Sequence, residues 1–189
     1  MVARAGFDAV LLTAQAGDDA AFSQLYRDLN PGVLRYLTAR APGAGQDLAA
    51  ETWMAVAGQL AAFRGGESAF RAWLFTIARR RLIQHWRDQR RRPSEPTDPD
   101  HLQDVPDGPD GVDPAEVAVG SLSAQEAVTV ISTTLTPDQA DVVLLRLVAG
   151  LDVDQVAAVL EKRPGTVRVL QHKAVRRLAG QMSREALTL

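Results

Sequence analysis

Apolar side chains recur along most of this chain at intervals of three and four residues, which is the spacing of one face of an α-helix. Asp18 is a predicted N-cap, and it precedes an apolar series at this spacing: Phe22, Leu25, Tyr26 and Leu29. The Asn30-Pro31-Gly32 sequence is expected to interrupt or kink that helix, because proline lacks the N–H that a helix interior uses. The apolar face then continues through Val33, Leu34 and Leu37.

Two more helices are predicted in the first half of the chain. The first covers residues 47–63 and follows a Pro- and Gly-containing loop at residues 41–45. The second begins after the loop at residues 64–68, with Ser68 as its expected cap, and runs to about Trp86. Both segments carry apolar residues at helical spacing, so each is expected to bury one face.

The second half of the chain predicts four shorter helices. They cover residues 124–135, a segment that begins at Thr136 and ends by Gly150, residues 154–160 and residues 166–178. Thr136 is the expected N-cap of the second, with Pro137 at the first helical position. An apolar series is expected to lie along that helix: Val142, Val143, Leu145 and Leu147. The chain from Gln181 onward is expected to fray.

Between these halves, residues 93–121 contain six prolines and few large apolar side chains. Such a segment cannot form a helix or bury enough surface to fold alone. The sequence therefore predicts an all-α protein with two small helical domains, at residues 1–92 and 122–189. They would be joined by a flexible linker, which could extend on the order of 90–100 Å.

The charge is strongly segregated along the chain, although the net charge of the 189 residues is only −2 and the pI is about 5.9. Residues 64–92 hold nine arginines and two acids, whereas residues 93–126 hold nine acids and no Lys or Arg. Basic residues return between Lys162 and Arg177. Two basic segments thus flank an acidic linker, a distribution that favours a polyanion as partner despite the acidic average.

Residues 154–170 have the pattern of a helix-turn-helix. Ala157 supplies the small residue that two closely crossing helices need, and Val156 and Leu160 can form a small core with Val167. The second helix would enter a major groove with one face. That face carries Thr166, Arg168, Val169, His172, Lys173 and Arg176. The alternative is the solvated basic face of an ordinary helical hairpin.

The segment from Phe63 to Arg87 interleaves arginines with aromatic residues around a pair of glycines. A surface of this kind binds single-stranded nucleic acid, because arginines follow the backbone and rings or pockets receive unstacked bases. For the aromatic residues Phe70, Trp73 and Trp86, whose spacing is helical, burial in the core is the better interpretation. The arginines instead require a counter-charge, since many like charges in one segment repel one another.

Several function classes lack support in the sequence. There is no cysteine, the three histidines are scattered, and no nucleophile–base pair or phosphate-binding loop is present, so we expect no metal, no cofactor and no enzymatic activity. No apolar run is long enough to span a membrane, and residues 1–8 do not resemble a signal peptide. A cytoplasmic location is therefore expected.

Taken together, these motifs resemble those of the extracytoplasmic-function (ECF) group of bacterial sigma-70 factors. Residues 17–26 with Asp47-Leu48 and Glu51-Thr52 resemble the opening of sigma region 2, and Phe63-Arg64-Gly65 with residues 70–79 resembles its promoter-melting part. The helix-turn-helix resembles region 4. The order and spacing match throughout the chain outside the linker and the extreme termini.

The resemblance implies a promoter-specific transcription initiation factor with several partners: the β′ clamp helices and β flap of bacterial core RNA polymerase, promoter DNA and an anti-sigma factor. The residues implied in core binding are Asp47, Leu48, Glu51, Thr52 and Met54. Those implied in binding a flipped base of the −10 strand are Arg64, Gly65, Ser68, Arg71, Arg79, Arg80 and Arg87. The six residues of the recognition face would bind the −35 duplex. The acidic linker would either enter the path of nascent RNA or serve only as a tether.

Some positions depart from the family pattern. Glu161 stands in the turn where many members have glycine, which predicts a strained or altered turn. Other departures are Arg80, Gln84, Arg163 and the Leu170-Gln171 order.

The alternative functions are a stand-alone helix-turn-helix regulator that binds duplex DNA and a protein whose charged helices bind only other proteins. Promoter melting that requires polymerase distinguishes a sigma factor from both.

Overall fold

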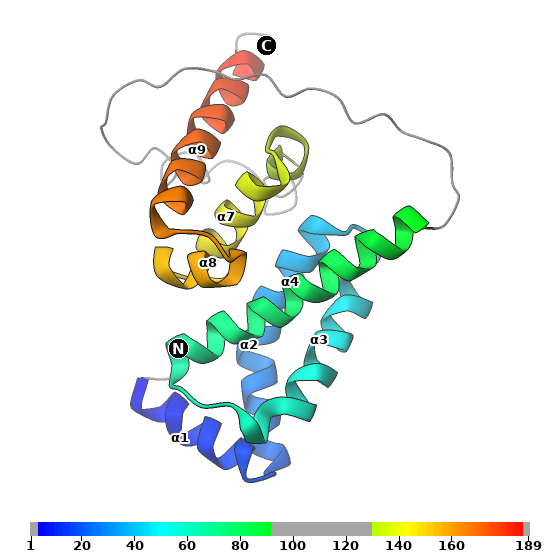
Figure 1. The fold of residues 1–189 in the computed structure, drawn as a ribbon, viewed down its shortest axis with the longest axis vertical. Coiled ribbons are helices and arrows are strands. Elements are labelled where there is room, and N and C mark those ends of the chain that lie inside the picture. Colours follow the sequence, from blue (N-terminus) through cyan, green and yellow to red (C-terminus); the bar gives the residue numbers. More distant parts are fainter. Residues whose placement is uncertain (1–3, 92–129, 187–189) are drawn as a thin grey trace.

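The computed structural model describes residues 4–91 and 130–186 (Figure 1). These ranges contain helices and no strand, so the prediction of an all-α chain is confirmed. The helices are α1 (Arg4–Gln15), α2 (Asp19–Arg40), α3 (Gly45–Gln59), the 3-10 helix η1 (Leu60–Ala62), α4 (Glu67–Arg91), α7 (Pro137–Leu147), α8 (Val153–Leu160) and α9 (Pro164–Ala186). Residues 130–134 are also helical. The acidic linker and the first half of the helix expected at 124–135 lie outside the described residues.

Helices α1 to α4 form the N-terminal domain, with α2, α3 and α4 as a bundle and α1 packed across one end (Figure 1). The core of this domain is built from one apolar stripe of each helix. Its side chains include Leu11, Leu25, Val33, Leu37, Val56, Phe70, Leu74 and Leu82. The sequence interpretation did not include α1, in which Phe7, Leu11 and Ala14 are buried and Val10 packs against the core. The i, i+3, i+4, i+7 spacing of these four residues is the signal that could have revealed the helix.

Helix α2 begins as predicted, because the Asp18 side chain accepts a hydrogen bond from the Ala21 N–H at 2.7 Å. The predicted interruption at Asn30-Pro31-Gly32 is wrong, since α2 continues through Pro31 to Arg40. A proline removes one backbone hydrogen bond, and the burial of Leu29 and Val33 on either side holds the helix together across that loss.

Helix α4 starts at Glu67, two residues earlier than expected, and Ser68 is not its cap. The Glu67 N–H instead donates to the Asp8 carboxylate of α1 at 3.0 Å. Helix α3 starts at Gly45, two residues before the predicted start, and its last turn tightens into η1. These boundaries place residues 63–66 as a short non-helical connection between η1 and α4.

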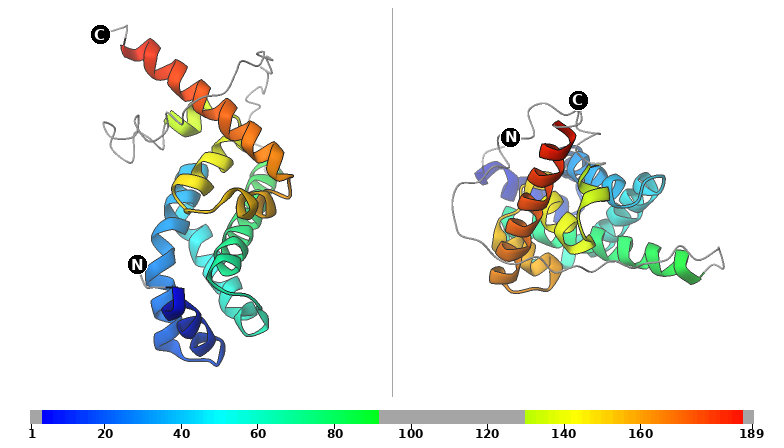
Figure 2. Two further views of the ribbon diagram at one scale, coloured as in Figure 1. Left: turned by 90° about the vertical axis from the view of Figure 1, so that its left-hand side faces the viewer. Right: turned by 90° about the horizontal axis from the view of Figure 1, so that it is seen from above.

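The C-terminal domain consists of α7, α8 and α9 within the described residues (Figure 2). Thr136 and Pro137 start α7 as predicted, with Gln139 completing a capping box. Leu147 does not belong to the apolar face expected for it, because it is 55% exposed at the end of the helix. Asp152 caps α8 through a second capping box. Helix α9 starts at Pro164 and extends to Ala186, beyond the predicted end and into the segment expected to fray.

The two domains contact each other, chiefly where α8 lies beside α4 (Figures 1 and 2). The buried carboxylate of Asp141 on α7 also faces α2 and α4. The sequence predicted two separate domains on a long linker. In this structure they share an interface that includes a buried ionic cluster.

Candidate nucleic-acid interface

The connection between η1 and α4 is shaped by backbone and side-chain contacts around Phe63, Arg64 and Gly65. Gly65 has a φ of 143°, and a Cβ added there would lie 2.8 Å from the Ala69 Cβ. This position therefore requires glycine. The Arg64 guanidinium folds back onto η1, where Nη1 donates to the carbonyls of Ala61 at 2.8 Å and Phe63 at 2.7 Å. Arg64 and Gly65 are both exposed.

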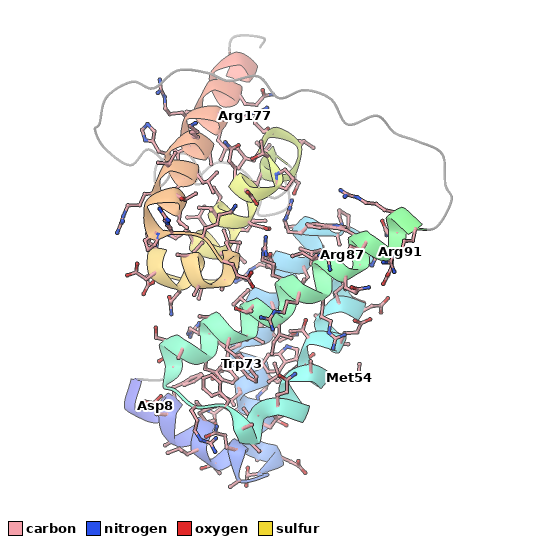
Figure 3. All side chains as sticks on the ribbon, in the orientation of Figure 1. Asp8, Met54, Trp73, Arg87, Arg91 and Arg177 are labelled. Atoms are coloured by element: carbon pink, nitrogen blue, oxygen red, sulfur yellow. The ribbon has the colours of Figure 1, made fainter. Side chains whose placement is uncertain are left out.

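Four predicted arginines of α4 differ in what they contact. Arg71 donates to Glu67 one turn earlier at 3.0 Å, and Arg79 donates to Asp141 at 3.3 Å. Arg80 and Arg87 are exposed, with Arg87 near the C-terminal end of the helix (Figure 3). Only Arg80 and Arg87 thus present their charge directly to solvent, while Arg71 is paired within its own helix and Arg79 with the other domain.

Asp141 is the centre of a polar cluster between the domains. Its Oδ1 accepts from Arg40 Nε at 2.8 Å and from the Tyr36 hydroxyl at 3.2 Å, and its Oδ2 accepts from Arg79. Burial raises the pKa of Tyr36 well above its ordinary value, and the neighbouring carboxylate raises it further, so the phenol stays protonated and donates. The Arg40 guanidinium also lies 4.9 Å from the ring centroid of Trp86.

A second polar contact joins the domains at the start of α4. Gln155 of α8 donates through Nε2 to the Ser68 hydroxyl at 2.7 Å and to the Ser68 carbonyl at 2.8 Å. Two of the predicted −10 residues, Ser68 and Arg79, are therefore already bonded to the C-terminal domain in this arrangement.

The aromatic residues around the loop form a packed cluster rather than an open stacking surface. Phe63 packs against both Phe70 and Trp73, with ring centroids 5.4 Å and 4.9 Å away, and the latter two rings also contact each other at 5.6 Å. Phe70 is fully buried, and Trp73 and Trp86 are partly buried. This confirms the interpretation that these rings belong to the core. It leaves the arginines and the loop backbone as the groups available to a nucleic acid.

The predicted core-binding residues on α3 divide into two groups. Asp47, Glu51 and Met54 are exposed, and Met54 points away from the bundle with 68% of its surface accessible (Figure 3). Leu48 and Thr52 are buried, and the Thr52 hydroxyl donates to the Leu48 carbonyl at 2.7 Å. The structure thus places Leu48 and Thr52 in the hydrophobic core, so they hold α3 in the bundle and are not part of its exposed face.

The helix-turn-helix forms as predicted, with α8 and α9 joined by a tight turn. Val156, Ala157, Leu160 and Val167 are buried between the helices. All six residues of the predicted recognition face are exposed: Thr166, Arg168, Val169, His172, Lys173 and Arg176. Glu161 in the turn adopts the left-handed conformation, with φ 55° and ψ 40°. The expectation of strain at this position is therefore confirmed.

Comparison with known proteins identifies both domains. The family model for Sigma-70 region 2 matches residues 24–92, and the model for Sigma-70 region 4 matches residues 125–178. The ECF RNA polymerase sigma factor ShbA of Streptomyces griseus is 32% identical over 177 residues, which cover 90% of this chain and 92% of that protein. The chain belongs to the ECF sigma-factor family.

A further relative of this ECF sigma factor is BldN of Streptomyces coelicolor, 31% identical over 168 residues. The match covers 88% of this chain and 62% of BldN. SigD of Mycobacterium tuberculosis is 28% identical over 93% of this chain and 83% of its own length.

The fold also matches solved structures. CnrH in complex with the cytosolic domain of CnrY superimposes with a TM-score of 0.62 at 21% identity, over 94% of this chain and 97% of CnrH. RpoE of Bartonella quintana, in complex with the anti-sigma factor NepR, gives a TM-score of 0.65 at 21% identity, over 86% of this chain and 96% of RpoE.

Sequence reasoning missed the residues that connect separate elements. Asp141 is a single acid within the apolar run from Ala140 to Leu145, and an isolated acid in a buried stripe is the signal that could have revealed it. Asp8 and Gln15 lie on the helix that was not predicted.

No membrane-spanning helix is found among the described residues, as judged by length and hydropathy.

Proposed function

We propose that this chain binds core RNA polymerase through α3, recognises the −10 strand through α4 with its preceding loop, and recognises the −35 duplex through α9. Its action is non-covalent. The observation that carries the proposal is that one chain presents two separate cationic helix surfaces, on α4 and on α9. Membership of the ECF sigma-factor family supports these assignments.

For core binding we propose the exposed face formed by Asp47, Glu51 and Met54. The two acids are one helical turn apart, so both can meet basic side chains of the β′ clamp helices. Met54 adds a flexible apolar side chain at the same face. Leu48 and Thr52 support this face from the core. The β flap is the proposed polymerase contact of the C-terminal domain.

For the −10 strand we propose the loop residues Arg64 and Gly65 together with Ser68, and the α4 arginines Arg71, Arg79, Arg80 and Arg87. Arg80 and Arg87 are open to a phosphate backbone, while Ser68 and Arg79 are bonded to Gln155 and Asp141. A strand that contacts all seven residues therefore requires α8 and α7 to move away from α4. The long segment between the domains permits such a separation.

For the −35 duplex we propose the exposed face of α9. Arg168, Lys173 and Arg176 suit phosphates or guanine edges, Val169 suits a thymine methyl group, and Thr166 and His172 complete the face. Val169 is 52% exposed, so its methyl groups are accessible to a partner. We further propose an anti-sigma factor as regulatory partner and action in the cytoplasm, where polymerase works.

In vitro transcription tests the proposal. Purified chain is added to sigma-free core polymerase from its host with a genomic promoter library. Specific transcripts that appear only when the chain is present are the expected result. No transcripts, together with no co-migration of chain and core on a sizing column, would favour a stand-alone DNA-binding regulator.

A further inference from the structure

Helix α1 contacts both ends of the connection between η1 and α4, the connection that our proposed function assigns to −10 recognition. We propose that Asp8 and Gln15 of α1 are positioning residues that hold this connection in the shape that recognises the −10 strand. This inference rests on the proposed function and adds two residues, from a helix that carries none of the DNA-binding positions.

The first contact is at the start of α4. The residue before Glu67 is Gly66, which has no side chain to cap the helix. Asp8 supplies the missing acceptor, because its Oδ1 lies 3.0 Å from the Glu67 backbone nitrogen (Figure 3). A carboxylate at this position also interacts favourably with the positive end of the helix dipole. A Cβ on Gly66 would lie 3.2 Å from the same oxygen, so glycine leaves room for the carboxylate.

The second contact is at the end of η1. The Gln15 side-chain amide donates through Nε2 to the Leu60 carbonyl at 3.1 Å and to the Phe63 carbonyl at 2.8 Å. The Leu60 carbonyl also accepts from the Phe63 backbone N–H at 3.1 Å, so the Gln15 amide adds a second hydrogen bond there and ties both ends of this turn to α1. The Phe63 carbonyl also accepts from Arg64, which ties the first proposed DNA-binding residue to the same point.

These two polar groups act from a firmly docked helix. Phe7, next to Asp8, is buried, and its ring centroid lies 5.8 Å from that of Phe70 on α4. Leu11 and Ala14 are buried on the same side of α1. Asp8 and Gln15 are seven residues apart, about two turns, so one face of a single helix reaches both ends of the connection.

The connection needs such support because it contains Gly65 and Gly66 in sequence. Glycine has more accessible backbone conformations than any other residue, so a free loop of this composition would lose substantial entropy on binding DNA. A loop already held in its bound shape avoids that loss and discriminates better between ligands. Asp8 and Gln15 thus affect promoter selectivity without contacting DNA.

The test uses the full chain assembled with core polymerase. The probes are a non-template oligonucleotide carrying the −10 sequence obtained from transcription and the same oligonucleotide with that sequence scrambled. For Asp8→Ala we expect the affinity ratio of the two probes to fall about three- to tenfold, the effect of losing one capping interaction. Asp8→Asn keeps an acceptor oxygen and should retain the wild-type ratio. Gln15→Glu places a carboxylate against two carbonyls and should lower the ratio at least as much.

Three further measurements separate positioning from folding. Affinity for core and affinity of the free chain for −35 duplex should be unchanged in Asp8→Ala, and amide hydrogen exchange at Glu67 should accelerate. Asp28→Ala, which removes an exposed acid from α2, is the matched control and should behave as wild type. The inference would be overturned if Asp8→Ala kept the wild-type ratio of affinities for the −10 and scrambled probes. It would also be overturned if Asp8→Ala lowered the affinities for core, −35 duplex and both probes together, or if Asp8→Asn did not retain the wild-type ratio.

Failure of this inference is distinct from failure of the proposed function. If the wild-type chain directs no transcription, the proposed function fails and the inference fails with it. If the wild-type chain initiates at a promoter and Asp8→Ala selects that promoter equally well, only the role of α1 is overturned.

Discussion

The Nε atom of Arg79 lies 3.3 Å from Oδ2 of Asp141, and this ion pair joins α4 of one domain to α7 of the other. The other carboxylate oxygen of Asp141 lies 2.8 Å from Nε of Arg40. One carboxylate therefore pairs with two arginines of the N-terminal domain. Arg79 cannot offer its Nε–H to a DNA phosphate while this pair persists, so the interface competes with the proposed −10 contact for this side chain.

Replacing Asp141 with Ala should open the interface. The substitution leaves Arg40, whose side chain is only 8% exposed, facing Arg79 without a counter-charge. Removing one partner of a buried pair costs about 3–5 kcal/mol, and separation of the domains relieves that cost by returning both arginines to water. The radius of gyration from small-angle X-ray scattering should increase, and affinity for single-stranded DNA should rise.

Asp138→Ala is the matched control for that experiment. It removes a carboxylate from the same helix, but one that pairs with Lys162 inside the C-terminal domain at 2.9 Å and is 45% exposed. Its scattering curve should match the wild type. Identical curves for Asp141→Ala and wild type would show that the ionic cluster does not hold the domains together.

Alkaline pH should weaken the same cluster through Tyr36. Its pKa in the folded state is raised, mainly by burial, so its contribution to stability is fully present below about pH 10, the ordinary pKa of tyrosine. As pH rises above that value, Tyr36 loses its proton first in the unfolded or opened state. The contribution of Tyr36 to the free energy of unfolding is then lost progressively until the pH reaches its pKa in the folded state. Denaturant titrations of wild type and Tyr36→Phe should show a steeper alkaline loss of stability in wild type; parallel curves would contradict the assignment.

Charge reversal on α3 should weaken binding to core polymerase. Asp47→Lys with Glu51→Lys turns the proposed acidic face into a basic one, which would repel basic side chains of the partner. Glu51 lies 3.9 Å from Arg81 with both side chains exposed, so loss of that pair should have little effect on folding. Fluorescence titration with core measures the effect, with Asp19→Lys and Asp28→Lys on α2 as the charge-matched control. If the α3 and α2 double variants bound core polymerase with equal affinity, the acidic face of α3 would be excluded as the core-binding surface.

Removal of two basic residues from α9 should weaken −35 binding and reduce its salt dependence. Each phosphate contact that is lost should lower the slope of log affinity against log salt by about 0.9. We expect Arg168→Ala with Lys173→Ala to lower both affinity and slope in duplex-binding titrations. Arg27→Ala with Arg35→Ala removes the same charge from exposed positions of α2. A recognition-helix variant with the wild-type slope would place both residues outside the interface.

Replacing Glu161 with Gly should stabilise the C-terminal domain. The left-handed conformation costs a residue with a Cβ roughly 1–2 kcal/mol, and glycine avoids this but has greater entropy when unfolded. The expected net gain in the free energy of unfolding is about 1 kcal/mol or less, measured by urea denaturation. Glu161→Ala removes the carboxylate and keeps the Cβ, so it should show no such gain. Equal stabilisation by Ala and Gly would indicate a charge effect instead.

The features that the sequence predicted correctly depend on neighbouring residues. The Asp18 cap, the Thr136-Pro137 start of α7 and the helix-turn-helix are each encoded within a few positions, so their pattern is visible in the chain. The exposed face of α9 followed directly from helical periodicity. The family resemblance assigned Leu48 and Thr52 to core-polymerase binding, but a family motif does not say which of its residues face the core of the domain.

The errors concern interactions between distant residues. Asp8 caps a helix that begins 59 positions later, and Asp141 meets Tyr36 across 105 positions. Nothing in the local sequence marks such partners, and Ser68 was a reasonable cap by local chemistry alone. Pro31 shows that a strong local signal can also be overridden. Proline ends isolated helices, but α2 continues through Pro31 because buried residues on both sides of it pack against the rest of the domain.

Helix α4 is continuous over 25 residues, from the α1 contact at its start to Arg91 at its end (Figure 3). At about 1.5 Å per residue it is a rod roughly 37 Å long. Groups of the −10 strand that bind at its two ends are therefore held at a fixed separation. The rigid helix α4 thus sets how many nucleotides fit between the two bound groups. Inserting or deleting nucleotides between them should keep the contact at one end of α4 and break the contact at the other end.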